Sequence, residues 1–267
     1  MGLELLDELA DLPRAGLPAG LAAAYGGDLG FDRPRLVANF VATIDGVVAI
    51  PELAQSNKLI SDASEPDRFV MGLLRAFADA VVIGSGTLRA SATGTWTAER
   101  AYPPAADAFA ELRRRLGRPP VPERVVLTGT GRLPESHPLF AEGALVVTTA
   151  IGAARLEGRL PAATTVLPVG GADAVDLGAA VEALRARGHE LILSEAGPRA
   201  FASLVAARLV DELFLTVSPL IAGRGAGNGR QALVEGFEAL PGERRGGRLL
   251  SVRRAGGHLF LRYELRP

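Results

Sequence analysis

Two glycine turns at strand-to-helix junctions are the segments of this sequence best suited to bind an anion. Residues 190–193 form a short apolar run, typical of a buried strand, which breaks at Ser194-Glu195-Ala196-Gly197-Pro198. A helix that starts at such a turn offers backbone N–H groups and the positive end of its dipole to a phosphate, and proline suits its first position. A second apolar run, residues 80–83, ends in Gly84-Ser85-Gly86-Thr87. Both junctions therefore predict phosphate binding.

Glu195 lies within the first junction, where its negative charge is electrostatically awkward beside an anion. We interpret it as facing a second ligand that is rich in hydrogen-bond donors and lies next to the phosphate. The simpler alternative is an ordinary turn with a surface glutamate. Because parallel strands present their carboxyl ends at one edge of a sheet, we expect the two junctions to lie together.

The glycine pattern does not match two familiar sites. In the dinucleotide fingerprint G-x-G-x-x-G the third glycine would fall on Arg89, and a serine hydrolase nucleophile at Ser85 would require G-x-S-x-G. The chain has no cysteine, and its three histidines, His137, His189 and His258, are far apart in the sequence. The sequence therefore predicts no metal site and disfavours a Ser-His nucleophile.

Other polar residues stand out at strand ends and on apolar faces. Asn39 lies inside an apolar strand predicted over residues 36–43, where its amide either bonds to neighbouring backbone or reaches a ligand. Arg75 lies beside the apolar face of a helix, near its C-terminal end. Its positive charge either interacts favourably with the helix dipole or binds a substrate anion. Thr128 and Gly129 end another strand, where they line a polar crevice or form a turn.

The elements that must position these residues alternate between strand and helix. Apolar runs predict buried strands over residues 36–43, 80–83, 124–127, 144–148, 165–169, 190–193 and 212–221. Periodicity and caps predict helices over residues 105–116 and 176–187, one that starts at Pro198, and one that opens at Ser64 with Asp67 in capping-box position. Strands over residues 248–253 and 258–263 have no helix between them, which predicts a hairpin.

This order of elements predicts an α/β fold with a mostly parallel central sheet, helices on both faces and an antiparallel C-terminal hairpin at the edge. We expect an N-terminal arm over residues 1–34, with a short helix over 4–10, and a single domain over residues 35–267. Residues 47–50 are predicted to return as a strand after Asp45-Gly46, and residues 91–102 to form an exposed loop with the single tryptophan.

Composition excludes several classes of partner. The chain of 267 residues has 29 basic and 30 acidic residues without a long run of either sign, which argues against nucleic acid or an anionic membrane as the main partner. The N-terminus lacks a basic lead before an apolar stretch, and no apolar run is long enough to span a bilayer. We therefore expect a cytoplasmic protein that acts on a small-molecule substrate.

Five motifs in order resemble the pyrimidine reductase domain of riboflavin biosynthesis: NFVATIDG at residues 39–46, ISDASEPDRFVMGLLRA at 60–76, VVIGSGTLRA at 81–90, SEAGPRAFASLV at 194–205 and LVDELFLTVSPLIAG at 209–223. The resemblance implies a fold similar to dihydrofolate reductase, and a homodimer. It implies NADPH-dependent reduction of ribosyl to ribityl in 2,5-diamino-6-ribosylamino-pyrimidinone 5′-phosphate or 5-amino-6-ribosylamino-uracil 5′-phosphate. The zinc-binding Cys-x-x-Cys and His-x-Glu phrases of the fused deaminase are absent, so we expect a stand-alone member.

The resemblance also implies roles for individual residues. We expect Glu195, Asn39 and Asp45 to act in catalysis, with Glu195 binding N–H groups of the pyrimidine and favouring a cationic imine. The implied substrate contacts are Ser56, Lys58, Arg75 and Glu195. The implied cofactor contacts, with Arg132 as the partner of a 2′-phosphate, are Ala42, Gly84, Ser85, Gly86, Thr87, Thr128, Gly129, Arg132, Gly197, Pro198, Arg199, Ala200 and Phe201.

Alternatives to this substrate remain open. Many members of the family carry an Asp-Asp-Pro and a Thr-x-Arg phrase that help to bind the sugar phosphate, whereas residues 91–96 of this chain read SATGTW. A reductase of another pterin or of a small imine or carbonyl substrate is therefore the first alternative. A non-catalytic nucleotide-binding module is the second.

Overall fold

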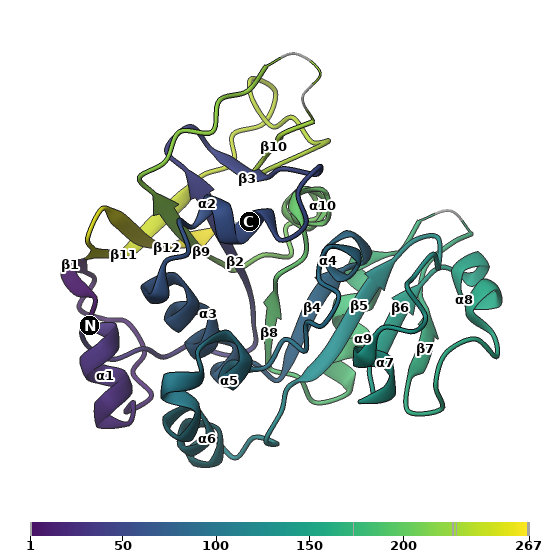
Figure 1. Cartoon of the computed structure of the whole chain (residues 1–267), viewed down its shortest axis with the longest axis horizontal. Coiled ribbons are helices and arrows are strands. Elements are labelled where there is room, and N and C mark those ends of the chain that lie inside the picture. Colours follow the sequence, from purple (N-terminus) through teal and green to yellow (C-terminus); the bar gives the residue numbers. More distant parts are fainter. Residues whose placement is uncertain (1, 173, 226, 228, 266–267) are drawn as a thin grey trace.

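A ten-stranded sheet runs through the molecule, in the strand order β1-β11-β12-β9-β2-β8-β4-β5-β6-β7 (Figure 1). The structure is a computed structural model that describes residues 2–172, 174–225, 227 and 229–265. The strands are β1 (Glu4–Glu8), β2 (Arg35–Thr43), β4 (Ala80–Gly84), β5 (Glu123–Thr128), β6 (Leu145–Thr148), β7 (Thr165–Pro168), β8 (Leu191–Ser194), β9 (Glu212–Ser218), β11 (Gly247–Ala255) and β12 (His258–Leu265).

The sheet is parallel from β9 to β7 and antiparallel beyond β9. β12 pairs with β9, β11 with β12, and β1 with β11, all in antiparallel register. The predicted α/β fold with a mostly parallel sheet and a C-terminal hairpin is therefore confirmed. The structure adds that β1, from the N-terminal arm, lies outside the hairpin and forms the edge strand.

Helices cover both faces of this sheet. They are α1 (Ala19–Tyr25), α2 (Ser56–Ile60), α3 (Glu65–Phe77), α4 (Ser85–Ala90), α5 (Ala98–Ala101), a 3-10 turn (Pro103–Ala105), α6 (Ala106–Arg115), α7 (Pro138–Ala141), α8 (Ala150–Leu156), α9 (Leu177–Ala186) and α10 (Pro198–Ala206). The larger core cluster lies on the face of α3 and α6, and the second lies on the face of α9 and α10. Among the helices of the described ranges, none combines the length and the apolar character that a bilayer span requires.

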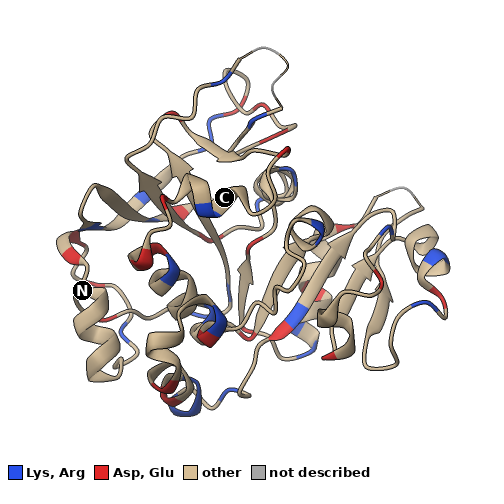
Figure 2. Cartoon of the chain, viewed as in Figure 1, with Lys and Arg blue, Asp and Glu red and all other residues tan. Residues whose placement is uncertain are grey.

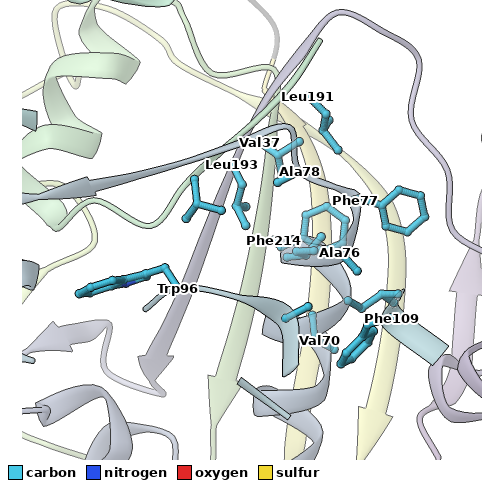
Figure 3. Packing of buried hydrophobic residues seen from close by; sticks show 14 of the residues in the cluster. Val37, Val70, Ala76, Phe77, Ala78, Trp96, Phe109, Leu191, Leu193 and Phe214 are labelled. Atoms are coloured by element: carbon cyan, nitrogen blue, oxygen red, sulfur yellow. The ribbon is translucent and has the colours of Figure 1, made fainter. Parts of the chain in front are cut away.

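α3 carries the longest apolar face against the sheet, and its sequence accounts for its start. The Ser64 hydroxyl accepts a hydrogen bond from the Asp67 N–H at 3.3 Å, and Pro66 occupies the first turn. Figure 3 shows the core beneath it, with Trp96 at one end and Phe77 and Phe109 at the other. Burying each such side chain contributes about 1.5–3 kcal/mol, so this packing fixes the helix on the sheet.

The predicted helix over residues 4–10 is wrong, because this segment forms strand β1. Its backbone pairs with β11, and Glu4 and Glu8 reach two arginines of that strand. Arg253 is almost fully buried, donates to the Glu8 carboxylate at 2.5 Å and lies 3.9 Å above the Tyr25 ring. A helix this short is marginal without tertiary support, so the ladder and the ion pairs decide the conformation.

Two further expectations are corrected. β3 (Val47–Ala49) forms where a returning strand was predicted, but it pairs with β10 (Gln231–Ala232) instead of β2. Trp96, expected in an exposed loop, is buried, and its ring lies 6.0 Å from that of His137. The polar neighbours of Trp96 suggested exposure, whereas the large apolar area of the indole favours burial.

The two ion pairs between β1 and β11 give a matched test of buried charge. Glu8→Ala leaves the buried Arg253 guanidinium without its counter-charge, which we expect to lower the free energy of unfolding by about 3 kcal/mol in a urea titration. Glu4→Ala removes the partner of an exposed arginine on the same strand pair and should cost less than about 1 kcal/mol. Equal losses in the two variants would contradict this account.

Candidate active site

The two glycine junctions lie against each other at the carboxyl edge of the sheet. β4 and β8 are neighbouring parallel strands, with Val82 opposite Ser194. A Cβ placed on Gly84 would stand 3.7 Å from the backbone nitrogen of Gly197, so the two turns pass in van der Waals contact. α4 and α10 start at these turns and then diverge, since Leu88 packs into the core on the α3 face and Phe201 into the core on the α9 face. The expected juxtaposition is confirmed.

The glycines at this edge face open space. Apart from chain neighbours and the glycine's own helix, no atom of the described residues lies within 4 Å of the position that a Cβ would take on Gly86, Gly129 or Gly197, and none of the three has a positive φ. Neither packing nor backbone conformation therefore requires glycine there. The open surface along three neighbouring turns has the form needed for close approach of a ligand to backbone N–H groups.

A cleft of about 950 Å³ continues from these turns past the ends of β5 and β6. It brings together four of the residues expected at the cofactor, namely Ser85, Thr128, Gly129 and Arg132. It also contains three arginines that the sequence did not single out as ligand contacts, which are Arg89, Arg155 and Arg159. Figure 2 shows basic segments on α4 and α8, which flank it. The cleft is therefore suited to a polyanionic ligand.

The four arginines of the cleft differ in their hydrogen bonds and ion pairs with the rest of the protein. Arg89 donates to the Arg132 carbonyl at 3.1 Å and Arg155 to the Thr130 carbonyl at 2.5 Å, so both brace the loop after β5. Arg159 pairs with Glu135 at 2.9 Å. Arg132 is exposed, and its guanidinium has no hydrogen bond or ion pair within the part of the chain that the structure describes. Arg132 is thus the arginine most available to a phosphate.

On the α3 side of the same edge, Arg75 and Glu195 form a buried ion pair. Arg75 donates from Nε to Glu195 Oε1 at 2.8 Å and from Nη2 to Oε2 at 2.6 Å, and its Nη1 donates to the Thr97 carbonyl at 3.2 Å. Each side chain is 9% exposed. This bidentate geometry holds the Glu195 carboxylate rigidly at the end of β8. The two residues that sequence reasoning assigned to the substrate are therefore direct partners.

β2 presents residues to both faces at this point. Ala38 pairs with Ser194, so Asn39 and Glu195 are the next residues along their strands, on the α3 side. Asn39 is half-buried, and its amide has no hydrogen-bond partner among the described residues. Ala42 is buried and lies on the opposite face, where Phe40 contacts Phe201 with ring centroids 4.9 Å apart. The side chain of Ala42, an expected cofactor contact, therefore points to the face opposite Asn39 and Glu195.

Asp45, expected in catalysis, binds donors of the protein itself. Its Oδ1 accepts from the Thr43 hydroxyl at 2.6 Å and from the Ala222 N–H at 3.0 Å, and its Oδ2 accepts from the Gly223 N–H at 2.6 Å. The hydrogen bond from Thr43, with those from the two backbone N–H groups, lowers the pKa of Asp45 to about 2. These contacts favour a structural role, in which Asp45 ties the turn after β2 to the loop after β9.

The remaining expected residues are more peripheral. The Ser56 hydroxyl accepts from the Ile50 N–H at 3.1 Å and so closes the segment before α2, while Lys58 is exposed on that helix. In α10 the side chains of Pro198 and Phe201 are buried, Arg199 is exposed and Ala200 is half-buried. Phe201 can therefore meet a ligand only through its backbone, whereas Thr87 on α4 is half-buried.

Asp67 is a buried acid on the α3 side that the sequence pattern placed only in a helix cap. Its side chain is buried on the α3 side and has a hydrogen bond with Thr216 of β9. Burial raises the pKa of Asp67 to about 6, with Thr216 and His258 opposing the shift and the charge of Glu195 adding to it. Its spacing of eight residues from Arg75 on one amphipathic helix was the available signal, since such residues share a face.

Comparison with known proteins places this chain in a family. The RibD C-terminal domain family matches residues 34–238. The 2,5-diamino-6-ribosylamino-4(3H)-pyrimidinone 5′-phosphate reductase of Archaeoglobus fulgidus is 28% identical over 192 residues, which covers 72% of this chain and 83% of the relative.

Solved structures share the fold at lower identity. A pyrimidine reductase-like protein of Corynebacterium diphtheriae is 22% identical, with a TM-score of 0.65 over 94% of this chain and 96% of that one. RibD of Acinetobacter baumannii is 18% identical, with a TM-score of 0.63 over 92% of this chain and 60% of that one. The riboflavin biosynthesis reductase of Saccharomyces cerevisiae is 14% identical, with a TM-score of 0.56 over 93% and 95%.

The contacts of Asp45 give a prediction for the loop after β9. Its pKa lies below the ordinary value of 3.8, so its stabilising contribution is present above that value and is lost as the pH falls through about 2. At pH near neutrality (about 7) Asp45→Asn should therefore speed hydrogen exchange at the Ala222 and Gly223 amides, measured by NMR. Asp62→Asn, an exposed change, should leave both rates unaltered. Unchanged hydrogen-exchange rates in Asp45→Asn would contradict the structural role of Asp45 in holding the loop after β9.

Proposed function

The chain belongs to the RibD C-terminal domain family, and we propose that it is an NADPH-dependent reductase of riboflavin biosynthesis. Its proposed substrate is 2,5-diamino-6-ribosylamino-4(3H)-pyrimidinone 5′-phosphate or 5-amino-6-ribosylamino-uracil 5′-phosphate, whose ribosyl group becomes ribityl. The A. fulgidus relative carries the name of the first of these activities. The observation that carries the proposal is the contact between the two glycine turns beside the buried Arg75–Glu195 pair.

The glycine edge fits the phosphates of a dinucleotide. Gly86, Gly129 and Gly197 leave room for a ligand to approach the backbone, and α4 and α10 start next to each other. When bound, NADPH supplies the hydride. The protein's own task is to orient the cofactor against an electrophilic carbon, to exclude water and to shape the local field.

The arginine-lined cleft supports the phosphorylated form of the cofactor. Arg132 has the guanidinium available for a 2′-phosphate, and Arg89 and Arg155 hold the loop that carries it. The planar guanidinium of an arginine can donate to two oxygens of one phosphate at once, and arginine retains its charge at all relevant pH values. We place the adenosine end of NADPH in this cleft, beside Thr128 and Gly129.

The substrate is proposed to bind on the α3 side, bounded by Asn39, Arg75 and Glu195. The free amide of Asn39 offers both a donor and an acceptor. Arg75 orients the buried Glu195 carboxylate, so Glu195 can accept hydrogen bonds from N–H groups of the pyrimidine and stabilise a cationic imine. The homodimer that the resemblance implies and the cytoplasmic location expected from the composition remain predictions.

Reductive turnover is the direct test of this function. The purified protein is given NADPH with the pyrimidine ribosyl phosphate and, separately, with dihydrofolate, and the loss of reduced nicotinamide absorbance is followed. Oxidation with the pyrimidine alone supports the proposal. Oxidation only with dihydrofolate would indicate a pterin reductase, and binding of NADPH without oxidation in either mixture would indicate a nucleotide-binding module.

Arg132→Gln tests the cofactor assignment. It removes a charge-assisted contact to the 2′-phosphate, worth about 1.5 kcal/mol at an exposed position, so the affinity for NADPH should fall about tenfold. The affinity for NADH, which lacks that phosphate, should stay the same, and both are measured by fluorescence titration. Arg114→Gln, an exposed change on α6, serves as the control. Parallel losses for NADPH and NADH would contradict the assignment.

Glu195→Gln tests the substrate side. Loss of the carboxylate should lower kcat about 100-fold, the order found when one preorganised electrostatic partner is removed, while NADPH affinity changes little. The exposed change Glu190→Gln, four residues before β8 ends, should leave kcat unaltered. If kcat and NADPH affinity fell together in Glu195→Gln, the residue would be structural.

A further inference from the structure

The proposed reduction consumes a proton as well as a hydride, so the site needs an acid. Opening the ribosyl ring breaks the bond between its anomeric carbon and the ring oxygen, while the lone pair of the attached nitrogen forms a C=N bond. The electron pair of the broken bond leaves on the ring oxygen, which must take up a proton. The hydride from NADPH then adds to the anomeric carbon. This inference rests on the function proposed above.

Two of the acidic residues expected in the site are unsuited to donate this proton. Both oxygens of Glu195 accept hydrogen bonds from the Arg75 guanidinium in a bidentate arrangement, so each oxygen already has a donor of the protein. Both oxygens of Asp45 accept from protein donors in an exposed turn, and its pKa is about 2. Each of these carboxylates therefore serves as an acceptor of hydrogen bonds from the protein itself.

Asp67 has the opposite environment. Its carboxyl is buried where α3 meets the sheet, has a hydrogen bond with the Thr216 hydroxyl, and forms no ion pair with any residue in the described ranges. The charged groups that act on it are His258 on β12 and Glu195 after β8, and Glu195 repels its negative charge. On its own helix, Arg75 is engaged by Glu195, and Glu65 and Arg68 are exposed.

We propose that Asp67 is the proton donor of this reductase and that it protonates the ring oxygen of the ribosyl group as the ring opens. Thr216, the hydrogen-bond partner of Asp67, pairs with Val41 of β2, two residues after Asn39 on the same face of the sheet. Asp67 therefore lies on the α3 side of the sheet, next to the strand that carries Asn39. Burial favours its neutral form, and a pKa of about 6 leaves part of the population protonated near neutral pH. Glu195 then stabilises the cationic imine while Asp67 supplies the proton.

A buried acid with a raised pKa changes how the stability of the protein depends on pH, and this effect can be measured without an activity assay. The folded pKa of Asp67 lies above its ordinary value of 3.8, so its contribution to stability is present below that value and is lost as the pH rises through about 6. Because asparagine does not ionise, the Asp67→Asn variant does not lose stability in this way as the pH rises. The melting temperature of Asp67→Asn relative to the unsubstituted protein should therefore increase between about pH 4 and pH 8. A constant difference would overturn the proposal.

Activity separates the proton donor from the reductase itself. Asp67→Asn should lower kcat about 100-fold or more with NADPH affinity retained, whereas Glu65→Gln in the same helical turn should leave kcat unchanged. If the unsubstituted protein turns over and Asp67→Asn keeps kcat within about twofold, only the proton donor is overturned. Absence of turnover by the unsubstituted protein would overturn both proposals.

Thr216→Val provides a second variant that keeps the acid. The Thr216 hydrogen bond lowers the pKa of Asp67, so its removal should raise that pKa. A proton donor is active while protonated, so kcat of the unsubstituted protein should fall as the pH rises through about 6, and in Thr216→Val this fall should move to higher pH. A fall at the same pH in both proteins would overturn the proposal.

Discussion

Parallel hydrogen bonding of β8 between β2 and β4 is the constraint on which the candidate site depends. Ser194 pairs with Ala38 on one side and with Val82 on the other, so β8 ends beside Val82 of β4, while β2 continues past Ala38 to Thr43. This register places Glu195 next to Asn39 and brings Gly197 into contact with Gly84. A slip of one residue would turn Glu195 to the opposite face, because side chains alternate along a strand. The site is thus a consequence of register.

Most buried charges among the described residues are paired, whereas Asp67 and Arg113 form no ion pair, and Arg113 donates to backbone carbonyls instead. Arg262 binds Glu212 at 2.7 Å, Arg253 binds Glu8 and Arg75 binds Glu195, each with further hydrogen bonds to the guanidinium. Such pairs offset the cost of desolvating both partners. Asp67 is buried with a hydroxyl partner and the charge of His258 nearby, and it is destabilised in its ionised form. That imbalance is what a proton donor requires and what a purely structural acid would avoid.

The two faces of the sheet give the proposed ligands separate approaches to one edge. α10 lies on the face of Phe40 and Ala42, while α3 lies on the face that carries Asn39, Glu195 and the core around Phe77. A dinucleotide along the glycine turns would therefore meet the substrate where β2 and β8 end. The arginine cleft beyond β5 extends the same edge and accounts for the length of a full dinucleotide.

Local patterns in the sequence determined the parallel α/β order, the cap at Ser64 and the two glycine turns, because periodicity and turn chemistry depend on near neighbours. Only the tertiary structure decided that residues 4–8 form a strand, that Trp96 is buried, that Arg75 binds Glu195 and that four arginines share one cleft. Arg75 and Glu195 are 120 residues apart. Contacts over such separations depend on register and packing, which no local pattern of residues specifies.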